Sequence, residues 1–271
     1  MSKQKKDDKK KKHTHKKKDD DSDDDSDDEK EYRMRDVYKE VIDKRFLVKH
    51  DNPAWEKTHI RLPMPIMVIL GSTGSGKTST LLNIMMATKK AWATVTIIAK
   101  SLEEPIYEHL IAHNEGNDDF RAFEGIESLP DLDVYDRKLH NLIVIDDMQN
   151  EPKRKQLVLD DYAIRCRKKG CSLVYLAQTF DRLPSALKKQ VSYLILKNVP
   201  KKRDLRLILS EYGNGDMSTD DLVQLMKFAT APSPGESRDS KTHFFMMDLC
   251  TSDPKYKYRR DFTPIYFAED A

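Results

Sequence analysis

The sequence predicts an α/β fold in which helices flank a mainly parallel central sheet, followed by a C-terminal pair of antiparallel strands. Two observations support the parallel sheet: the apolar runs are short and continuous rather than alternating, and helical stretches separate them. A third observation concerns the end of the chain, where two apolar segments flank a charged turn. That arrangement is typical of an antiparallel pair.

The elements are expected in the following order. The apolar residues Val37, Val41, Ile42 and Phe46 predict a short helix that runs into an extended segment. Prolines then interrupt the chain before the first strand. The parallel strands are expected at 66–70, 95–99, 142–145, 173–177 and 193–196, helices at 78–88 and 155–168, and the antiparallel pair at 243–249 and 263–267.

By composition the chain divides into a charged tail, residues 1–30, and one globular domain, residues 31–271. The tail contains 11 Lys and 11 acidic residues and has no apolar residue after Met1. It is therefore expected to be disordered, because it buries too little apolar surface to offset the entropy of ordering. The Lys-rich block either binds nucleic acid or acts as a nuclear address, or the whole tail is a solvated polyampholyte.

Membrane proteins and disulfide-rich secreted proteins are excluded as classes. The longest near-continuous apolar run, 64–70, falls well short of the ~20 residues that a spanning helix needs. Three cysteines at irregular spacing do not suit a disulfide framework or a zinc site. We therefore expect an intracellular protein from a reducing compartment, without a membrane span.

The strongest motif follows the first strand. The segment Gly71-Ser72-Thr73-Gly74-Ser75-Gly76-Lys77-Thr78 matches G-x-x-x-x-G-K-[ST] at every fixed position, between a strand and a helix. In such a loop the backbone N–H groups surround a polyphosphate, Lys77 reaches the β- and γ-phosphates, and the Thr78 hydroxyl binds Mg²⁺. The alternative is a simple Gly/Ser turn.

Two acids end a later strand. In 141–147 four aliphatic residues precede Asp146 and Asp147, and adjacent carboxylates at a buried strand end are costly unless a cation sits there. We expect this strand to neighbour the first one, with Asp146 holding Mg²⁺ and Asp147 acting as general base toward the attacking water. The alternative is a solvated acidic turn. Gln178, at the tip of the next strand, is placed to contact the γ-phosphate or that water.

Together these motifs resemble the FtsK–HerA superfamily of P-loop motor ATPases. The resemblance is carried by 71–78, 143–147 and 167–178, and it extends over about 60–267. Within the superfamily the chain is most similar to the DNA-packaging ATPases of poxvirus-like large DNA viruses and virophages. The resemblance implies a RecA/ASCE-like P-loop NTPase fold and a homo-oligomeric ring that uses ATP and Mg²⁺ to drive double-stranded DNA into a preformed capsid.

The resemblance also implies partners and roles. Capsid or portal vertex proteins would be partners, and the protein would work in the virion or at an assembly site in the host cytoplasm, or in the nucleus through the Lys-rich tail. Arg167 stands where the family has an arginine finger, which completes the active site of a neighbouring subunit. The family usually has Arg-His there, whereas this chain has Arg167-Lys168, so Arg165 is the alternative finger.

A translocating ring needs cations in its pore that contact DNA phosphates without reading bases. The best candidates are Lys153, Arg154 and Lys155, expected in a loop directly after the acidic pair. The alternative is the solvated first turn of a helix. A terminal segment of alternating aromatic and basic residues, 255–260, either stacks on DNA or forms a turn between strands.

Three other functions compete with genome packaging. A DNA helicase or translocase of the same superfamily would use the same fold and ring. A P-loop nucleotide kinase also has the phosphate loop, but it needs an Arg-rich lid and lacks the double acid followed by a strand-end glutamine. A non-motor P-loop switch is disfavoured, because Lys77, Thr78, Asp146 and Asp147 are all present.

Overall fold

The computed structural model describes residues 35–47, 60, 66–88, 90–213, 215 and 217–265. The chain divides into two units, residues 1–47 and 48–271. In the first unit a short helix, α1 (Val37–Glu40), is capped by the Asp36 side chain, and a 3₁₀ turn follows at Lys44–Phe46. The tail that was expected to be disordered, residues 1–30, lies outside the described residues, so the domain boundary at residue 30 stays a prediction.

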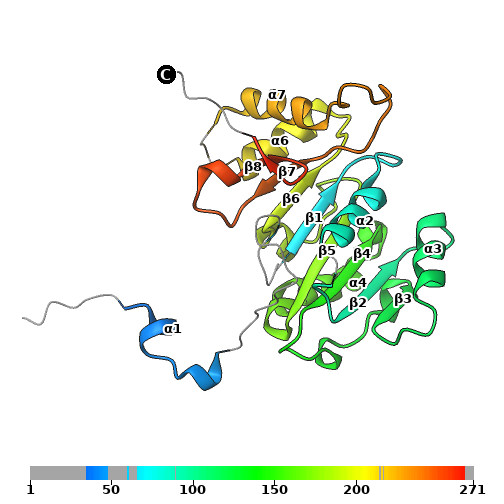
Figure 1. Cartoon of the computed structure of the whole chain (residues 1–271), viewed down its shortest axis with the longest axis vertical. Coiled ribbons are helices and arrows are strands. Elements are labelled where there is room, and N and C mark those ends of the chain that lie inside the picture. Colours follow the sequence, from blue (N-terminus) through cyan, green and yellow to red (C-terminus); the bar gives the residue numbers. More distant parts are fainter. Residues whose placement is uncertain are drawn as a thin grey trace, which may run out of the picture. The chain divides into compact units, whose positions relative to one another are not determined.

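A single nine-stranded sheet organises the described part of the second unit (Figure 1). Its order is β3-β2-β4-β5-β1-β6-β7-β8-β9, and every pairing from β3 to β6 is parallel. The strands are β1 (Ile66–Leu70), β2 (Thr94–Ala99), β3 (Phe120–Glu124), β4 (Asn141–Asp146), β5 (Cys171–Ala177), β6 (Tyr193–Leu196), β7 (Phe245–Asp248), β8 (Tyr258–Arg260) and β9 (Thr263–Pro264). The predicted fold class, a mainly parallel sheet with antiparallel strands at the C-terminal end, is confirmed.

Helices cover both faces of this sheet, because alternate residues of each buried strand point to opposite sides. Val68 of β1 packs in a core with residues of α4, α5, α6 and α7, whereas Met67 packs in a second core with residues of α2 and α3. These helices are α2 (Lys77–Ala87), α3 (Pro105–His113), α4 (Lys153–Arg165), α5 (Ser185–Lys189), α6 (Lys202–Tyr212) and α7 (Thr219–Thr230). No helix within the described ranges is long and apolar enough to cross a membrane.

The C-terminal pairing differs from the expected one. β7 pairs antiparallel with β8, and β8 pairs with β9, so the partner of 243–249 is Tyr258–Arg260 rather than 263–267. Basic residues hid this strand in the sequence. Arg259 is buried in it because its guanidinium lies 2.7 Å from the buried carboxylate of Asp248, which offsets the cost of desolvating either charge.

Two further differences concern the parallel strands. The edge strand β3 was not predicted, since Phe120-Arg-Ala-Phe-Glu is only half apolar and half exposed. The strand that ends at Asp146 also does not neighbour β1, because β5 lies between β1 and β4. This insertion places the carboxyl ends of β1, β5 and β4 next to one another at one edge of the sheet, with the end of β5 in the middle.

Candidate functional site

The loop after β1 is folded for the close approach of an anion. Gly76 has a φ of +85° and precedes Lys77, the first residue of α2. At Gly71 an added Cβ would lie 2.6 Å from Ser75 Oγ and 2.7 Å from the Cβ of Lys197, so no larger residue fits. The loop is tied to its neighbours by Gly71 N–H, which donates to Ala177 O at the end of β5 (3.1 Å). The strand–loop–helix context required of a P-loop is therefore present.

Lys77 lies at the centre of this phosphate loop, residues 71–78. Its ammonium donates to the carbonyl oxygen of Ser72 at 3.2 Å, so the side chain folds back over the loop. Burial lowers the pKa of Lys77, and the carboxylates of Asp146, Asp147 and Glu104 oppose that shift by favouring the charged form. The lysine and these three acids thus interact within one electrostatic cluster.

Asp146, the last residue of β4, is buried and bonded to a tyrosine. The hydroxyl of Tyr107 in α3 donates to Asp146 Oδ2 at 2.5 Å. Burial raises the pKa of Asp146 to about 6. Asp146 and Thr78 line the same cavity, and a buried carboxylate together with a threonine hydroxyl is a donor set that suits Mg²⁺.

Asp147 stands in a left-handed conformation, with a φ of +56°, at the turn after β4. This turn directs its carboxylate toward β5, where Gln178 Nε2 donates to Asp147 Oδ1 at 3.0 Å. The carbonyl oxygen of the same amide accepts a hydrogen bond from Thr73 Oγ1 at 3.1 Å. Gln178 therefore joins the phosphate loop to the second acid across the end of the intervening strand.

A second glutamine, which the sequence did not single out, supports this bridge. Gln149 is buried, and its side-chain carbonyl accepts hydrogen bonds from the backbone N–H groups of Gln178 (3.2 Å) and Thr179 (3.1 Å). Its amide lies 3.5 Å from Asp147 Oδ1. Gln149 thus fixes the backbone on which Gln178 stands.

Lys77, Thr78, Asp146, Asp147 and Gln178 line one cavity of about 560 Å³, called the site cavity below. Glu104, at the start of α3, also lines it. So do Lys241 and Thr242, which follow α7 by more than ten residues. Within the described chain, its lining residues are Thr73, Gly74, Gly76, Lys77, Thr78, Ser79, Asn83, Glu104, Ile106, Asp146, Asp147, Gln178, Lys241 and Thr242.

The two arginines considered as fingers lie at the other edge of the sheet. Arg167 is exposed in a 3₁₀ turn (Cys166–Lys169) before β5, whereas Gln178 follows β5. Seven strand residues separate the two, which corresponds to about 20 Å. Arg165 is paired with Asp161 at 2.9 Å. The sheet therefore keeps both arginines away from the phosphate loop of their own chain.

The expected pore loop is helical. Lys153, Arg154 and Lys155 form the first turn of α4, after a 3₁₀ turn at Met148–Asn150, so the expectation of a loop was wrong. Lys155 is paired with Glu127 (2.9 Å) and Glu151 (3.3 Å).

The terminal basic segment is also more structured than a turn. It contains β8, and Lys257 and Arg259 are both buried. Arg260 donates to the carbonyl oxygens of Phe228 and Ala231 at the end of α7. These three cations therefore stabilise the fold, and the idea that the alternating segment stacks on DNA is not supported for them.

Comparison with known families decides between the classes of P-loop protein. Residues 57–236 match the family model described as Poxvirus A32 protein. The chain belongs to the poxvirus A32 protein family. The match includes the phosphate loop, both acids and Gln178, so the resemblance to viral packaging ATPases that the motifs implied is confirmed.

Solved structures with similar folds are also P-loop ATPases. One is the genome packaging NTPase B204 of Sulfolobus turreted icosahedral virus 2 in complex with sulfate, at 17% identity and a TM-score of 0.47, covering 70% of this chain and 94% of that chain. Another is EssC (ATPases 2 and 3) from Geobacillus thermodenitrificans, at 12% identity and a TM-score of 0.45, covering 67% of this chain and 37% of that chain. The comparison with curated proteins found no significant match.

Proposed function

We propose that this poxvirus A32 family protein is an ATP-hydrolysing motor that moves double-stranded viral DNA into a preformed capsid. One observation carries the proposal: Gln178 bridges Thr73 of the phosphate loop and Asp147, inside the cavity that also holds Lys77 and Asp146. A P-loop protein that only binds nucleotide has no need for this link between its phosphate loop and a carboxylate placed to activate water.

The residues divide the work of hydrolysis among them. The backbone of residues 71–76 and the ammonium of Lys77 bind the β- and γ-phosphates of ATP. Thr78 and Asp146 would hold Mg²⁺, which supplies positive charge to the phosphate oxygens. Asp147 accepts a proton from the attacking water, and Gln178 orients that water because its amide already contacts Asp147.

The same bridge, formed by Gln178, also connects the γ-phosphate site to α4. When the γ-phosphate leaves, the groups that contact it, Thr73 and Gln178, lose a partner. The backbone N–H of Gln178 is hydrogen-bonded to Gln149, which lies in the 3₁₀ turn that precedes α4. We propose that this connection transmits hydrolysis to α4, whose first turn carries Lys153 and Arg154.

The position of Arg167 supports oligomerisation. A strand of about 20 Å separates Arg167 from Gln178 at the end of the sheet that holds the phosphate loop, so an arginine finger at this position would act at the site of another subunit. A head-to-tail contact that repeats in this way forms a ring when the rotation between neighbouring subunits closes, and an open filament when it does not. We therefore propose a homo-oligomeric ring with Arg167 as the finger. Arg165 is the weaker candidate, because Asp161 already occupies its guanidinium.

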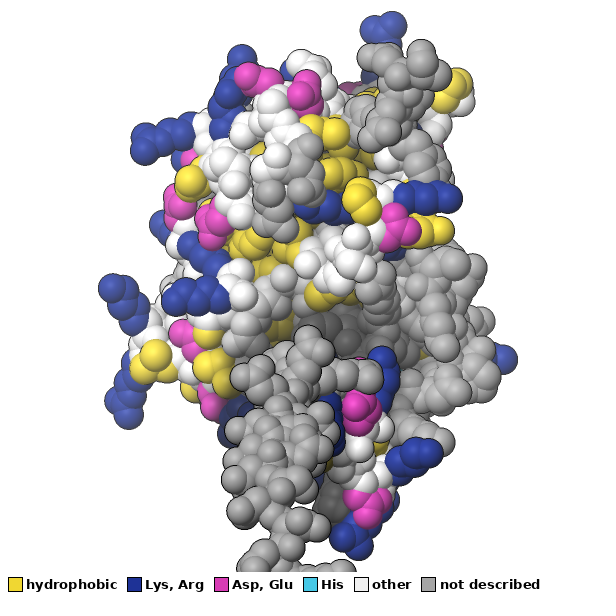
Figure 2. Space-filling view, turned by 90° about the vertical axis from the view of Figure 1, so that its left-hand side faces the viewer, with side chains coloured by type: hydrophobic (Ala, Val, Ile, Leu, Met, Phe, Trp, Pro, Cys, Tyr) yellow, Lys and Arg dark blue, Asp and Glu magenta, His cyan; other side chains and the backbone are white. Residues whose placement is uncertain are grey.

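Contact with DNA is assigned to the first turn of α4. On the face shown in Figure 2, the described Lys and Arg side chains are interspersed with Asp and Glu rather than gathered in one patch. A few cations in a pore suffice for a motor that does not read bases. We propose that Lys153 and Arg154 serve there, and that Lys155 is engaged by its two glutamates instead. Capsid or portal vertex proteins are the proposed further partners.

The test is ATP hydrolysis by the purified protein with and without double-stranded DNA, beside Lys77→Ala. Stimulation by DNA that Lys77→Ala abolishes is the expected result. Hydrolysis indifferent to DNA would contradict the motor, and transfer of phosphate to a nucleotide would identify a kinase. Strand separation on a forked substrate would indicate a helicase instead of a packaging motor.

A further inference from the structure

The segment between α7 and β7, residues 231–243, crosses over the phosphate loop and is called the strap here. Both of its ends are fixed. At one end Arg260 donates to the carbonyl oxygen of Ala231 (2.7 Å) and to Ser233 Oγ (3.0 Å). At the other end His243 Nδ1 lies 2.7 Å from Asp261 Oδ2, while its Nε2 lies 2.9 Å from Ser233 Oγ. The strap is therefore a closed, internally bonded unit.

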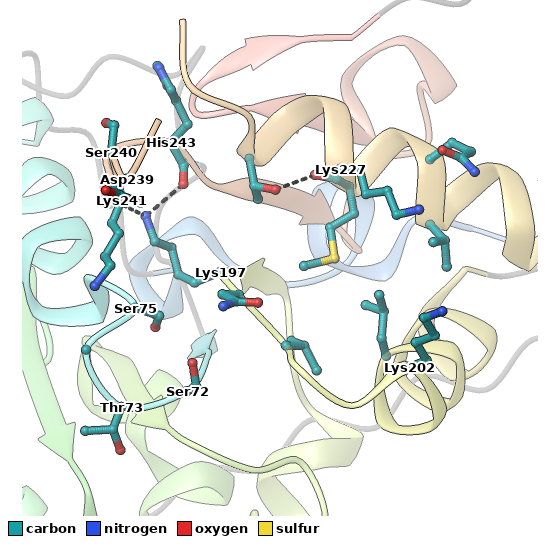
Figure 3. Close-up of a pocket in the computed structure, with 18 of the residues that line it drawn as sticks. Ser72, Thr73, Ser75, Lys197, Lys202, Lys227, Asp239, Ser240, Lys241 and His243 are labelled. Atoms are coloured by element: carbon teal, nitrogen blue, oxygen red, sulfur yellow. Dashed lines mark hydrogen bonds between the residues drawn. The ribbon is translucent and has the colours of Figure 1, made fainter. Parts of the chain in front are cut away.

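A buried lysine holds the middle of the strap. Lys197 follows β6 and is 2% exposed. Its ammonium donates to three consecutive backbone carbonyls, those of Lys241 (2.6 Å), Thr242 (3.3 Å) and His243 (2.8 Å), as Figure 3 shows for part of this set. An ammonium has three N–H donors, so each finds an acceptor. A buried charge is costly without such bonds, so movement of the strap away from Lys197 would be unfavourable. The ammonium therefore fixes the position of the strap backbone.

The fixed backbone brings Lys241 against the phosphate loop. A Cβ on Gly76 would lie 3.0 Å from the carbonyl oxygen of Lys241 and 3.3 Å from its Cβ. A Cβ on Gly74 would lie 4.0 Å from Lys241 Nζ, so the side chain runs along the loop toward Gly74 (Figure 3). Lys241 also lines the site cavity.

Within the part of the chain that the structure describes, the ammonium of Lys241 is not engaged by another side chain. The side chain is exposed, and among the described residues it forms no ion pair and donates no hydrogen bond. Three acids line the same cavity, yet Lys241 is paired with none of them. A free cation beside the glycines that approach a polyphosphate is placed to bind one of its oxygens.

We propose that Lys241 is a second phosphate-binding lysine, which acts in cis and contacts a non-bridging oxygen of the bound nucleoside triphosphate, with Lys197 as the positioning residue that holds it there. This inference rests on the proposed ATPase function. It adds a contact from the C-terminal part of the chain, which the phosphate-loop motif does not contain.

The experiment compares Lys241→Met, Lys241→Arg and a matched control, Lys202→Met, in the full-length protein. Lys202 is an exposed lysine that lines the neighbouring cavity but not the site cavity. Binding of a fluorescent ATP analogue and steady-state hydrolysis are both measured. We expect Lys241→Met to lower kcat/KM for ATP by about 10–100-fold. Lys241→Arg should recover most of this loss, and Lys202→Met should match the wild type.

The role of Lys197 is tested by a double-variant cycle. If Lys197 acts through Lys241, then Lys197→Met weakens binding of the analogue about as much as Lys241→Met does, and the double variant loses no more than either single one. A purely structural lysine would instead give additive losses. Thermal unfolding monitors the fold of each variant. Should Lys197→Met fail to fold, the Lys241 series, whose substitutions change only an exposed side chain, still decides the proposal.

The outcomes separate this inference from the proposed function. If the wild type hydrolyses ATP and Lys241→Met binds and turns over nucleotide like Lys202→Met, the second lysine is refuted while the ATPase stands. If the wild type binds the analogue but does not hydrolyse ATP with DNA, the proposed function fails, and the binding series still tests Lys241. A wild type that binds no nucleotide overturns both.

Discussion

Gln178 Nε2 donates to Asp147 Oδ1 at 3.0 Å, although the two residues follow different strands of the sheet. The other end of the same amide accepts from Thr73 in the phosphate loop. A single side chain therefore contacts both the loop that binds the phosphates and the carboxylate that is proposed to take the proton from water. Removal of this contact should affect hydrolysis more than binding.

Gln178→Ala should lower kcat by about 10–100-fold with little change in nucleotide affinity. The reason is that the amide orients the water and Asp147, whereas Lys77 and the loop backbone bind the phosphates. Steady-state hydrolysis and equilibrium binding of an ATP analogue check this split. Equal losses in affinity and kcat would show that Gln178 maintains the structure of the site rather than orienting the attacking water.

Lys77→Ala should impair nucleotide binding, whereas Asp147→Asn should impair hydrolysis. Without Lys77 the phosphates lose their main cation, so we expect nucleotide binding to fall by at least about 100-fold. Without the Asp147 carboxylate the water loses its base, so hydrolysis should fall by about 10²–10⁴-fold while binding stays. Nucleotide-induced thermal stabilisation reports binding, and released phosphate reports hydrolysis. An Asp147→Asn variant with wild-type turnover would show that Asp147 is not the general base.

Arg167→Ala should inhibit mixed oligomers more than its share of subunits accounts for. Its guanidinium lies at the opposite edge of the sheet from its own phosphate loop, so the defect appears at the site of a neighbour. The measurement is DNA-stimulated hydrolysis as the variant is titrated into the wild type, with Arg165→Ala as the control. A linear decrease, or an effect from Arg165→Ala alone, would exclude Arg167 as the finger.

Asp146→Asn should stabilise the metal-free protein by about 1–3 kcal/mol at pH 7. Burial raises the pKa of Asp146 from 3.8 to about 6, so the folded state binds more protons than the unfolded state between these values. The wild-type free energy of unfolding therefore falls as the pH rises through this window, and the cost of the charge is fully present above pH 6. Well below pH 3.8 the carboxyl is protonated in both states and the cost is absent.

Urea unfolding without divalent ions at pH 7 and pH 4 checks this prediction. The gain from Asp146→Asn should shrink at the lower pH, because the wild-type carboxyl then becomes neutral. Tyr107→Phe is the matched comparison: it removes the hydroxyl that bonds the carboxylate, so it should destabilise the protein at pH 7. A gain from Asp146→Asn that does not depend on pH would point to packing rather than charge.

Lys153→Ala and Arg154→Ala should weaken DNA binding and uncouple hydrolysis from DNA movement. Each substitution removes one phosphate contact, so the slope of log affinity against log salt should decrease by about one. Lys155→Ala is the control from the same turn, because Glu127 and Glu151 hold that ammonium. Basal hydrolysis without DNA should stay unchanged in all three. Equal salt slopes for the three variants and the wild type would place DNA elsewhere.

Much of the site was predictable because it is local in sequence. The loop 71–78, the acids 146–147 and Gln178 each follow an apolar strand, and parallel strands bring their carboxyl ends to one edge. The order of the strands was not predictable. β5 inserts between β1 and β4, and this insertion is what places Gln178 between the loop and the acid.

The site residues that the sequence did not reveal are not marked by any motif in the surrounding sequence. Tyr107 lies in a helix with typical apolar spacing, and Gln149 lies in a short turn. β8 was obscured because Arg259 is charged, and its burial is explained by a partner 11 residues away, the carboxylate of Asp248. The expected pore loop is helical. The sequence could not reveal this, because nothing in Lys153-Arg154-Lys155 distinguishes the solvated first turn of a helix from a loop.

The sequence by itself determined the phosphate loop, the acidic pair and the parallel strands, because glycine placement and continuous apolar runs act over a few neighbouring residues. Only the tertiary structure decided which side chains meet. Thr73 contacts Gln178 across 105 residues, and Lys197 holds the backbone of Lys241 across 44. Contacts at such separations depend on strand order and on which charges find buried partners, and both are properties of the assembled sheet rather than of any local segment.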